Sequence, residues 1–256
     1  MVFLIFLIAT MTVPTPTNPV RAIVIGAGSR GNAYARAVTN ATSAQVVAVA
    51  EPRTFVRNEF GHRYIWGART PAAHEAFESW TDFLEYERAR RQREAEGAAV
   101  EPGVDAAFIC VLDELHVQVI EDLKELRLHI LCEKPLATTL RDVLRIWRYI
   151  QPGGYDKSRQ DEGRIFGIGH VLRYSPHNML LRDILLGKDG KGGAIGDVLS
   201  IEHTEPVGWW HFAHSYVRYV VKLPLYAKTL YHTWLTIADL YSEAIGAKNQ
   251  EQRHHS

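Results

Sequence analysis

The segment Val20-Arg-Ala-Ile-Val-Ile-Gly-Ala-Gly-Ser-Arg-Gly31 decides the fold of this chain. An apolar run enters a turn in which Gly26, Gly28 and Gly31 have the spacing G-x-G-x-x-G. In such a turn the first glycine permits the tight bend and the second lets the backbone approach a pyrophosphate group. The third lets the following helix pack closely against the strand. The segment therefore predicts a strand that runs into a phosphate-binding turn.

A helix and a second strand follow this turn. Ser29 and Arg30 lie within the turn, and the alanine-rich segment 32–39 is expected to be a helix whose N-terminal N–H groups and positive dipole end favour phosphate. The apolar segment 45–50 is expected to be a strand, and Glu51 ends it 20 residues after the last glycine. A carboxylate in that position hydrogen-bonds the adenosine ribose. Together these features predict a dinucleotide site that contains the glycines, Ser29, Arg30 and Glu51.

The choice between NAD and NADP is open in the sequence. Glu51 favours a ribose without a phosphate, whereas Arg53, two residues later, favours a 2′-phosphate. Arg53 is therefore included among the candidate cofactor-binding residues.

The composition is typical of a soluble globular protein. The chain has 256 residues, of which 46% are hydrophobic and 23% charged, enough for one large domain or two smaller ones. Its 29 basic and 29 acidic residues cancel, which leaves no charge pattern for binding nucleic acid or an anionic membrane. Cys110 and Cys132 lie in apolar runs, so we expect two buried thiols and a cytoplasmic protein rather than a disulfide.

The first 19 residues are expected to be a disordered leader. Segment 2–9 is apolar but shorter than the ~20 residues that span a bilayer, and no positive region precedes it. We expect Met11 to be the functional start and residues 1–10 to be an incidental extension. A genuine targeting signal is the alternative.

Strand and helix patterns alternate through most of the chain. This alternation predicts an α/β fold with a doubly wound parallel sheet, in which ligands bind beyond the carboxyl ends of the strands. Besides the elements above, we expect strands at 104–112, 128–132 and 165–171, a strand or loop at 64–67, and helices at 55–63, 80–96, 115–126, 139–150 and 176–186.

Two of these helices have distinctive faces. In the helix expected at 80–96, residues 85–94 carry charges of both signs at helical spacing, which predicts a solvated face rather than a basic binding patch. Ser79 or Thr81 is the candidate N-cap of this helix. In the helix that Thr138 or Thr139 begins, four apolar side chains are expected on one face, namely Leu140, Val143, Leu144 and Trp147.

The character of the sequence changes after residue 187. Alternation over 197–207 predicts one antiparallel strand, and only a single helical pattern, over 226–245, follows it. One strand cannot bury the face of a sheet. We therefore expect a Rossmann domain over 20–173 and an incomplete α+β domain over 174–256.

Four motifs resemble the glucose–fructose oxidoreductase/inositol dehydrogenase (Gfo/Idh/MocA) family over about residues 20–218. They are Ala22-Ile-Val-Ile-Gly-Ala-Gly-Ser-Arg-Gly31, Val49-Ala-Glu-Pro52, Leu131-Cys-Glu-Lys-Pro-Leu-Ala137 and Gly169-His-Val-Leu-Arg-Tyr174. The resemblance implies a Rossmann domain followed by an antiparallel α+β domain. It also implies NAD or NADP as the cofactor, hydride transfer with a sugar or polyol, and a homo-oligomer.

The resemblance also assigns roles to strand-end residues. Lys134 would lie beside the nicotinamide, where its ammonium group can hydrogen-bond the reacting hydroxyl and stabilise an alkoxide. Glu133 would support Lys134, and Pro135 would fix the turn through a cis peptide bond. All three are candidate cofactor-binding residues, and Lys134 is the candidate catalytic residue.

Three further residues are assigned to the substrate by the same resemblance. Arg173 and Tyr174 lie where the family chain enters its substrate cleft. His116 matches a histidine that often follows the fourth strand, although a packed histidine is the preferred alternative.

The chain departs from the family pattern after about residue 219. Family members have a Lys-x-x-His-Asp helix whose histidine is the general acid/base, and Lys228 and His232 do not reproduce its spacing. A non-catalytic NAD(P)-binding module, or a defective truncated product, is therefore the alternative to an active enzyme. The other histidines of this region have no metal-ligand spacing with carboxylates, so no metal is expected at His203, His211 or His214.

Overall fold

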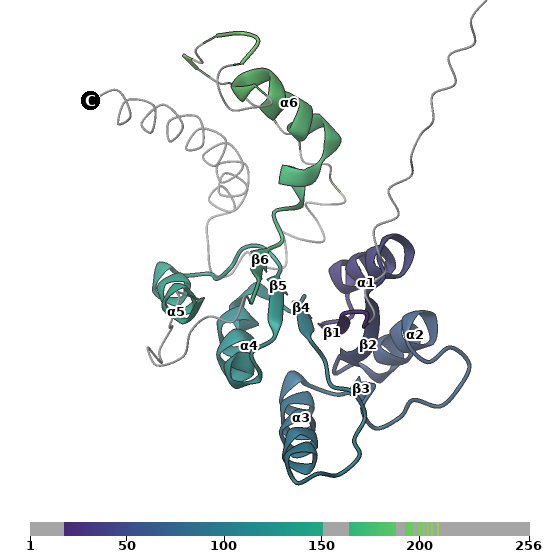
Figure 1. Ribbon diagram of the computed structural model, residues 1–256. Helices are drawn as coiled ribbons and strands as arrows, with labels where there is room; N and C mark the ends of the chain where they lie inside the picture. The colour runs from purple at the N-terminus through teal and green to yellow at the C-terminus, as the bar shows by residue number, and fades with distance from the viewer. Residues whose placement is uncertain are drawn as a thin grey trace, which may run out of the picture. The chain divides into compact units, whose positions relative to one another are not determined.

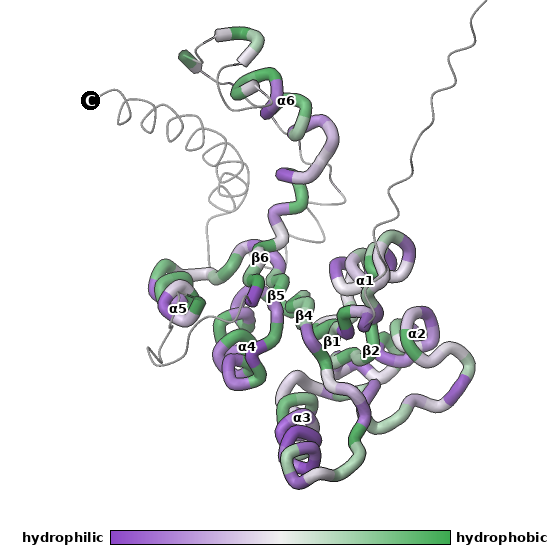
Figure 2. The backbone as a smooth tube through the Cα atoms, in the orientation of Figure 1, coloured by the Kyte–Doolittle hydropathy of each residue, from purple (hydrophilic) through white to green (hydrophobic). Residues whose placement is uncertain are grey.

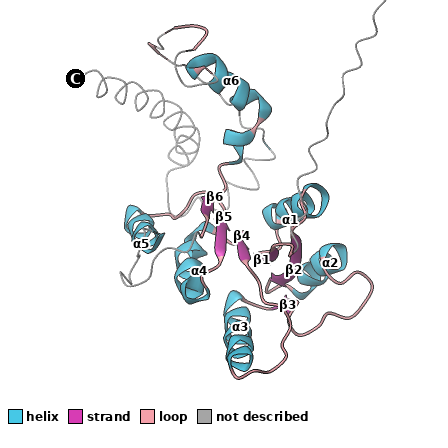
Figure 3. Ribbon diagram, in the orientation of Figure 1, coloured by secondary structure: helices cyan, strands magenta, loops and turns pink. Residues whose placement is uncertain are grey.

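The computed structural model describes residues 18–150 and 164–187, together with a few positions between 193 and 209. A parallel sheet of six strands forms its centre, in the order β3-β2-β1-β4-β5-β6 (Figures 1 and 3). The strands are β1 Arg21–Ile25, β2 Gln45–Ala50, β3 Ala76–Phe77, β4 Ala106–Ile109, β5 His129–Cys132 and β6 Phe166–Ile168. The α-helices are α1 Ser29–Ala41, α2 Thr54–Tyr64, α3 Trp80–Ala95, α4 His116–Leu123, α5 Leu140–Ile150 and α6 Pro176–Leu186. This is the Rossmann strand order, so the expected doubly wound sheet is confirmed.

Helices cover both faces of the sheet, which explains why its strands are apolar throughout. In β1, Val24 packs toward α1 and α2, whereas Ile23 and Ile25 belong to the core beneath α3, α4 and α5. Green, hydrophobic segments accordingly run through the central strands (Figure 2). The strand order reverses between β1 and β4, and ligands bind beside such a point in open α/β sheets.

Of the two alternatives for residues 64–67, a strand or a loop, the strand is wrong, and the third strand lies later in the chain. Residues 64–67 form no strand, and β3 comprises only Ala76 and Phe77. Trp66 instead folds back onto α2, where a Cβ on Gly61 would lie 1.8 Å from the indole ring. The backbone N–H of Trp66 also donates to the Gly61 carbonyl at 2.9 Å. A two-residue strand carries too little periodicity to be found from sequence.

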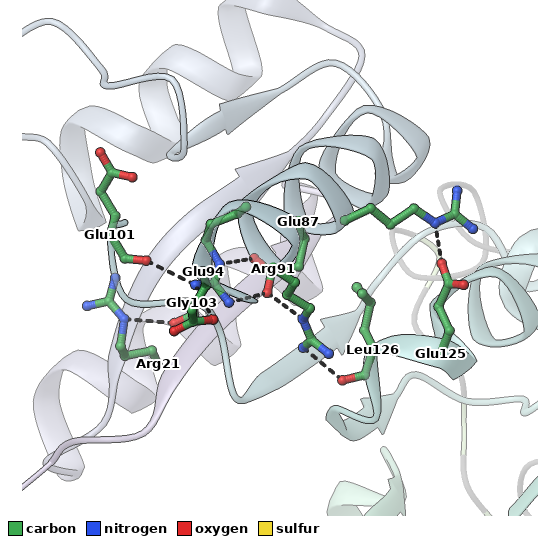
Figure 4. A network of polar contacts seen from close by, with 10 residues as sticks. Arg21, Glu87, Arg91, Glu94, Glu101, Gly103, Glu125 and Leu126 are labelled. Atoms are coloured by element: carbon green, nitrogen blue, oxygen red, sulfur yellow. Dashed lines mark hydrogen bonds and ion pairs between the residues drawn. The ribbon is translucent and has the colours of Figure 1, made fainter. Parts of the chain in front are cut away.

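The charged face of α3 is not fully solvated, which corrects the expectation for residues 85–94. Glu87 is 2% exposed and Arg90 5% exposed. Arg90 donates through Nε and Nη2 to the Glu87 carboxylate at 2.9 Å, and Arg91 Nε donates to it at 2.8 Å (Figure 4). The helix begins with a capping box between Ser79 and Asp82, so Ser79 is the cap.

The apolar face expected for α5 is confirmed at Val143 and wrong at the other three positions. Leu140, Leu144 and Trp147 are exposed. The side of the helix that packs into the core carries Val143 and the fully buried Ile146. The cap at Thr139 is confirmed, because its Oγ1 accepts a hydrogen bond from the Asp142 N–H at 3.2 Å.

The chain divides into two compact units at Gly169/His170. In the second unit, α6 has the predicted bounds and follows a 3₁₀ turn, Val171–Tyr174. The predictions for 1–17, 226–245 and the tail from 219 lie outside the described residues, as does most of the strand expected over 197–207. Cys132 is buried, as expected, whereas Cys110 is half-buried; both are free thiols. In the described part of the chain, none of the helices has both the length and the apolar character needed to cross a membrane.

Candidate functional site

The three glycines of the turn after β1 meet different constraints. Gly26 has a φ of +95°, and a Cβ there would lie 2.6 Å from the Cys110 carbonyl oxygen. A Cβ on Gly31 would lie 2.2 Å from the Gly26 carbonyl oxygen. Gly28 has nothing within 4 Å of its Cβ position. Gly26 and Gly31 are thus required by packing inside the protein, whereas Gly28 faces open space at the carboxyl edge of the sheet, the edge at which the strands end.

The first turn of α1 offers N–H groups to an anion. Gly28 is the N-cap and uses no side chain, and the first turn holds no acidic residue. Ser29 and Arg30 are exposed there. The side-chain amide of Asn32 donates to the backbone carbonyls of Ala27 and Gly28 at 2.9 and 3.0 Å. The N–H groups at the start of an α-helix have no intrahelical partner, so this turn is suited to a phosphate group.

Glu51 lies against the glycine turn. Its carboxylate is buried and accepts a hydrogen bond from the Ala27 N–H at 3.0 Å through Oε2. Its Oε1 accepts from the Arg53 N–H at 3.2 Å and from Arg53 Nε at 2.8 Å. Burial alone would raise the pKa of Glu51, but the hydrogen bonds from Arg53 and Ala27 outweigh it and hold that pKa below its usual value. An ionised carboxylate therefore lies between the turn and the Arg53 guanidinium group.

A second buried carboxylate ends β5. Glu133 accepts a hydrogen bond from the Tyr34 hydroxyl at 2.6 Å through Oε1, and from the Lys134 N–H at 3.2 Å through Oε2. The Lys134–Pro135 peptide bond is cis, as the resemblance implied. Burial and the hydrogen bond to Glu133 raise the pKa of Tyr34, so its hydroxyl keeps its proton.

His116 is buried where α4 begins. Its Nδ1 lies 2.9 Å from the Pro135 carbonyl oxygen and its Nε2 lies 3.2 Å from the Val111 carbonyl oxygen. The ring is 1% exposed, so both nitrogens face the protein. In this structure His116 ties the end of β4 to the turn after β5.

The sequence-predicted residues fall into two groups. The first unit brings together the glycine turn, Glu51 and Arg53 around α1, and it brings together Glu133, Lys134, Pro135 and His116 after β5. Arg173 and Tyr174 are exposed residues of the 3₁₀ turn in the second unit. Their assignment to a substrate stays a prediction.

Sequence reasoning missed the partners that hold the two carboxylates. Tyr34 is 99 residues from Glu133, and nothing in their spacing indicates a contact. The Arg57 guanidinium group donates to the Glu51 carbonyl oxygen and is buried. Among the described positions there is no cluster of three metal-ligating side chains.

Comparisons with known proteins agree with the observed fold. Residues 20–154 match the Gfo/Idh/MocA model, described as an oxidoreductase family with an NAD-binding Rossmann fold. No curated protein matches the chain.

Solved structures show the same fold. The myo-inositol 2-dehydrogenase of Lactobacillus plantarum is 20% identical, with a TM-score of 0.50 over 65% of this chain and 41% of that one. The scyllo-inositol dehydrogenase of Lactobacillus casei with bound NAD(H) and scyllo-inositol is 17% identical, with a TM-score of 0.50 and the same coverage. This chain therefore spans about two fifths of the length of these structures.

Proposed function

The chain belongs to the Gfo/Idh/MocA oxidoreductase family, and we propose that it binds NAD(H) at the carboxyl edge of its sheet for hydride transfer with a sugar or polyol hydroxyl group. The observation that carries this proposal is the hydrogen bond between Glu51 and the glycine turn. The buried carboxylate accepts a hydrogen bond from Ala27, directly before the open first turn of α1. Phosphate groups would bind that turn, and Glu51 would bind the adenosine ribose.

Preference for NAD over NADP is part of this proposal. Arg53 is the cation that would meet a 2′-phosphate, but its Nε donates to the ionised Glu51 carboxylate. A 2′-phosphate would have to approach that carboxylate, and two anions repel each other at short distance. We therefore expect NADH to bind more tightly than NADPH.

Lys134 is the residue that would act on the substrate. When bound, the nicotinamide ring accepts or donates the hydride. The Lys134 ammonium group would hydrogen-bond the reacting hydroxyl and stabilise the negative charge that develops on its oxygen. The backbone N–H of Lys134 donates to the Glu133 carboxylate, which holds the residue at the end of β5. The polyol class of substrate comes from the family resemblance and from the inositol dehydrogenases of the same fold.

A module that binds NAD(H) without turnover is the second candidate. It is favoured by one observation: Lys228 and His232 do not reproduce the Lys-x-x-His-Asp spacing of the family's general acid/base helix. General acid/base catalysis contributes about 10²–10⁴-fold to rate, so loss of that histidine alone would slow turnover by about this factor.

Two measurements test the proposal. NADH and NADPH are titrated against the full chain by nicotinamide fluorescence, and NAD⁺-dependent oxidation is then followed with a panel of polyols and sugars. Binding with turnover supports the enzyme, and binding without turnover supports the module. Absence of NADH binding to the folded chain would contradict both.

A further inference from the structure

We infer that Tyr34 is a positioning residue that couples the phosphate-binding helix α1 to the turn that carries Lys134. The inference rests on the proposed function and names a residue through which the two halves of the dinucleotide site act on each other.

The Tyr34 side chain is fixed in direction. Tyr34 lies three residues after Gly31, about one turn further along α1. Its ring stacks on Phe108 of β4, with centroids 5.4 Å apart and planes 16° apart. Its hydroxyl donates to Glu133 Oε1 at 2.6 Å, the length of a strong hydrogen bond to a charged acceptor. The tyrosine therefore connects the helix that follows the glycine turn with the end of β5.

Glu133 passes this connection on to Lys134. Its carboxylate is 6% exposed, and its second oxygen accepts from the Lys134 N–H at 3.2 Å. Its own N–H donates to the Ile109 carbonyl at 2.9 Å, which anchors it to β4. Glu133 therefore bonds both the Tyr34 hydroxyl and the Lys134 backbone, one through each carboxylate oxygen.

Gly169, the residue directly after β6, packs against the Tyr34–Glu133 hydrogen bond. The Gly169 N–H donates to the Cys132 carbonyl at 2.7 Å. A Cβ on Gly169 would lie 2.8 Å from the Tyr34 hydroxyl oxygen and 3.0 Å from Glu133 Oε1. A side chain at this position would displace the Tyr34 hydroxyl and the Glu133 carboxylate and so disturb their hydrogen bond.

This arrangement predicts which part of a bound dinucleotide depends on the Tyr34 hydroxyl for its affinity. Phosphate and adenosine ribose would contact the first turn of α1 and Glu51, neither of which bonds the tyrosine hydroxyl. The nicotinamide half would meet Lys134, whose backbone depends on Glu133. Loss of the hydroxyl should therefore weaken binding of the whole dinucleotide and spare a ligand that lacks nicotinamide.

The test compares ADP-ribose and NADH in Tyr34→Phe, which keeps the stacked ring and removes only the hydroxyl. Titrated against the full chain, NADH affinity should fall about tenfold while ADP-ribose affinity stays within about twofold. Tyr64→Phe is the matched control: its hydroxyl donates at 3.3 Å to Asn32 of the same helix, so its loss should leave both affinities unchanged. Equal losses for the two ligands in Tyr34→Phe, or no loss, would overturn the coupling.

Glu133→Gln supplies a second route if Tyr34→Phe does not fold. The glutamine keeps an acceptor for Tyr34 but presents an amide in place of the oxygen that bonds Lys134, so it should also weaken NADH and spare ADP-ribose. When both variants fold, the double variant should lose no more NADH affinity than the weaker-binding single variant, because the residues act in series. Additive losses would contradict the inference. Wild-type protein that binds neither ligand would instead overturn the proposed function itself.

Discussion

The two edges of the sheet hold their charged side chains in different ways. At the amino edge, where strands begin, Glu87 pairs with Arg90 and Arg91, and Arg21 Nε donates to the Gly103 carbonyl at 2.9 Å (Figure 4). Arg91 also donates to the Leu126 carbonyl at 2.9 Å. These groups satisfy one another within the protein. At the carboxyl edge, an ionised Glu51, the open first turn of α1 and the exposed Arg53 lie together.

This difference separates charged side chains that stabilise the fold from charged side chains that are available to bind a ligand. A buried carboxylate bonded to a buried arginine, as Glu87 is to Arg90, adds to stability only while its partner stays in place. A carboxylate whose partner is an exposed side chain can exchange that partner for the hydroxyl groups of a ligand at little cost. Substitutions at the amino edge should therefore change the free energy of unfolding, and substitutions at the carboxyl edge should change dinucleotide affinity.

The largest effect is expected for Gly26→Ala, which affects both properties. Its positive φ and the overlap with the Cys110 carbonyl should together cost about 4 kcal/mol of stability, and NADH binding should be lost with the distorted turn. Urea unfolding and an NADH titration measure the two effects. A stable Gly26→Ala variant with normal affinity would show that the turn is not constrained as described.

Glu87→Gln should affect stability alone. Removing the charge leaves the buried Arg90 guanidinium group without its principal partner, at a cost of about 3 kcal/mol. NADH affinity should be unchanged below the new melting temperature. Glu85→Gln, on the exposed side of the same helix, is the control and should be nearly neutral. A loss of NADH affinity in the folded Glu87→Gln variant would break the separation between the edges.

Gly28→Ala should show the opposite pattern. The new methyl group has open space around it, so only the poorer N-cap propensity of alanine should act, and the free energy of unfolding should fall by no more than about 1 kcal/mol. The methyl would occupy space through which phosphate approaches the backbone, so NADH affinity should fall at least about tenfold. Calorimetric titration of NADH checks this, and unaltered affinity would argue against phosphate binding at this turn.

The smallest effect concerns pH and Glu51. Because the folded protein holds its pKa below the usual 4.5, the ionised carboxylate contributes stability that is complete above pH 4.5 and is lost as pH falls through the folded value. Glu51→Gln should be less stable than wild type near neutral pH, and the gap in the free energy of unfolding should narrow as the pH falls below 4.5. Unfolding curves from pH 3 to 7 measure it, with the exposed Glu59→Gln as control. A gap that widens toward acid would reverse the assigned sign.

The features predicted correctly from the sequence are those that depend on the spacing of residues close together in the chain. The glycine turn, Glu51 at the end of β2 and the bounds of α6 each depend on residues close together in the chain. The Tyr34–Glu133 hydrogen bond joins residues 99 positions apart, so no local pattern could reveal it.

The remaining differences have physical causes as well. Glu87 and Arg90 are charged, and charge alone suggests solvent; only the packing of α3 against the loop before β4 shows that they are buried. On α5, Leu140 and Trp147 look like core residues by type, yet the helix presents Ile146 to the sheet.

The central claim, that the dinucleotide binds at the carboxyl edge, is tested most directly by mapping backbone amide resonances during a titration with NAD⁺. The account predicts shifts at Ala27–Gly31, at Glu51 and at Lys134, with the amides of Glu87, Arg90 and Gly103 unmoved. Shifts centred on the amino edge, or none at saturating NAD⁺, would contradict it.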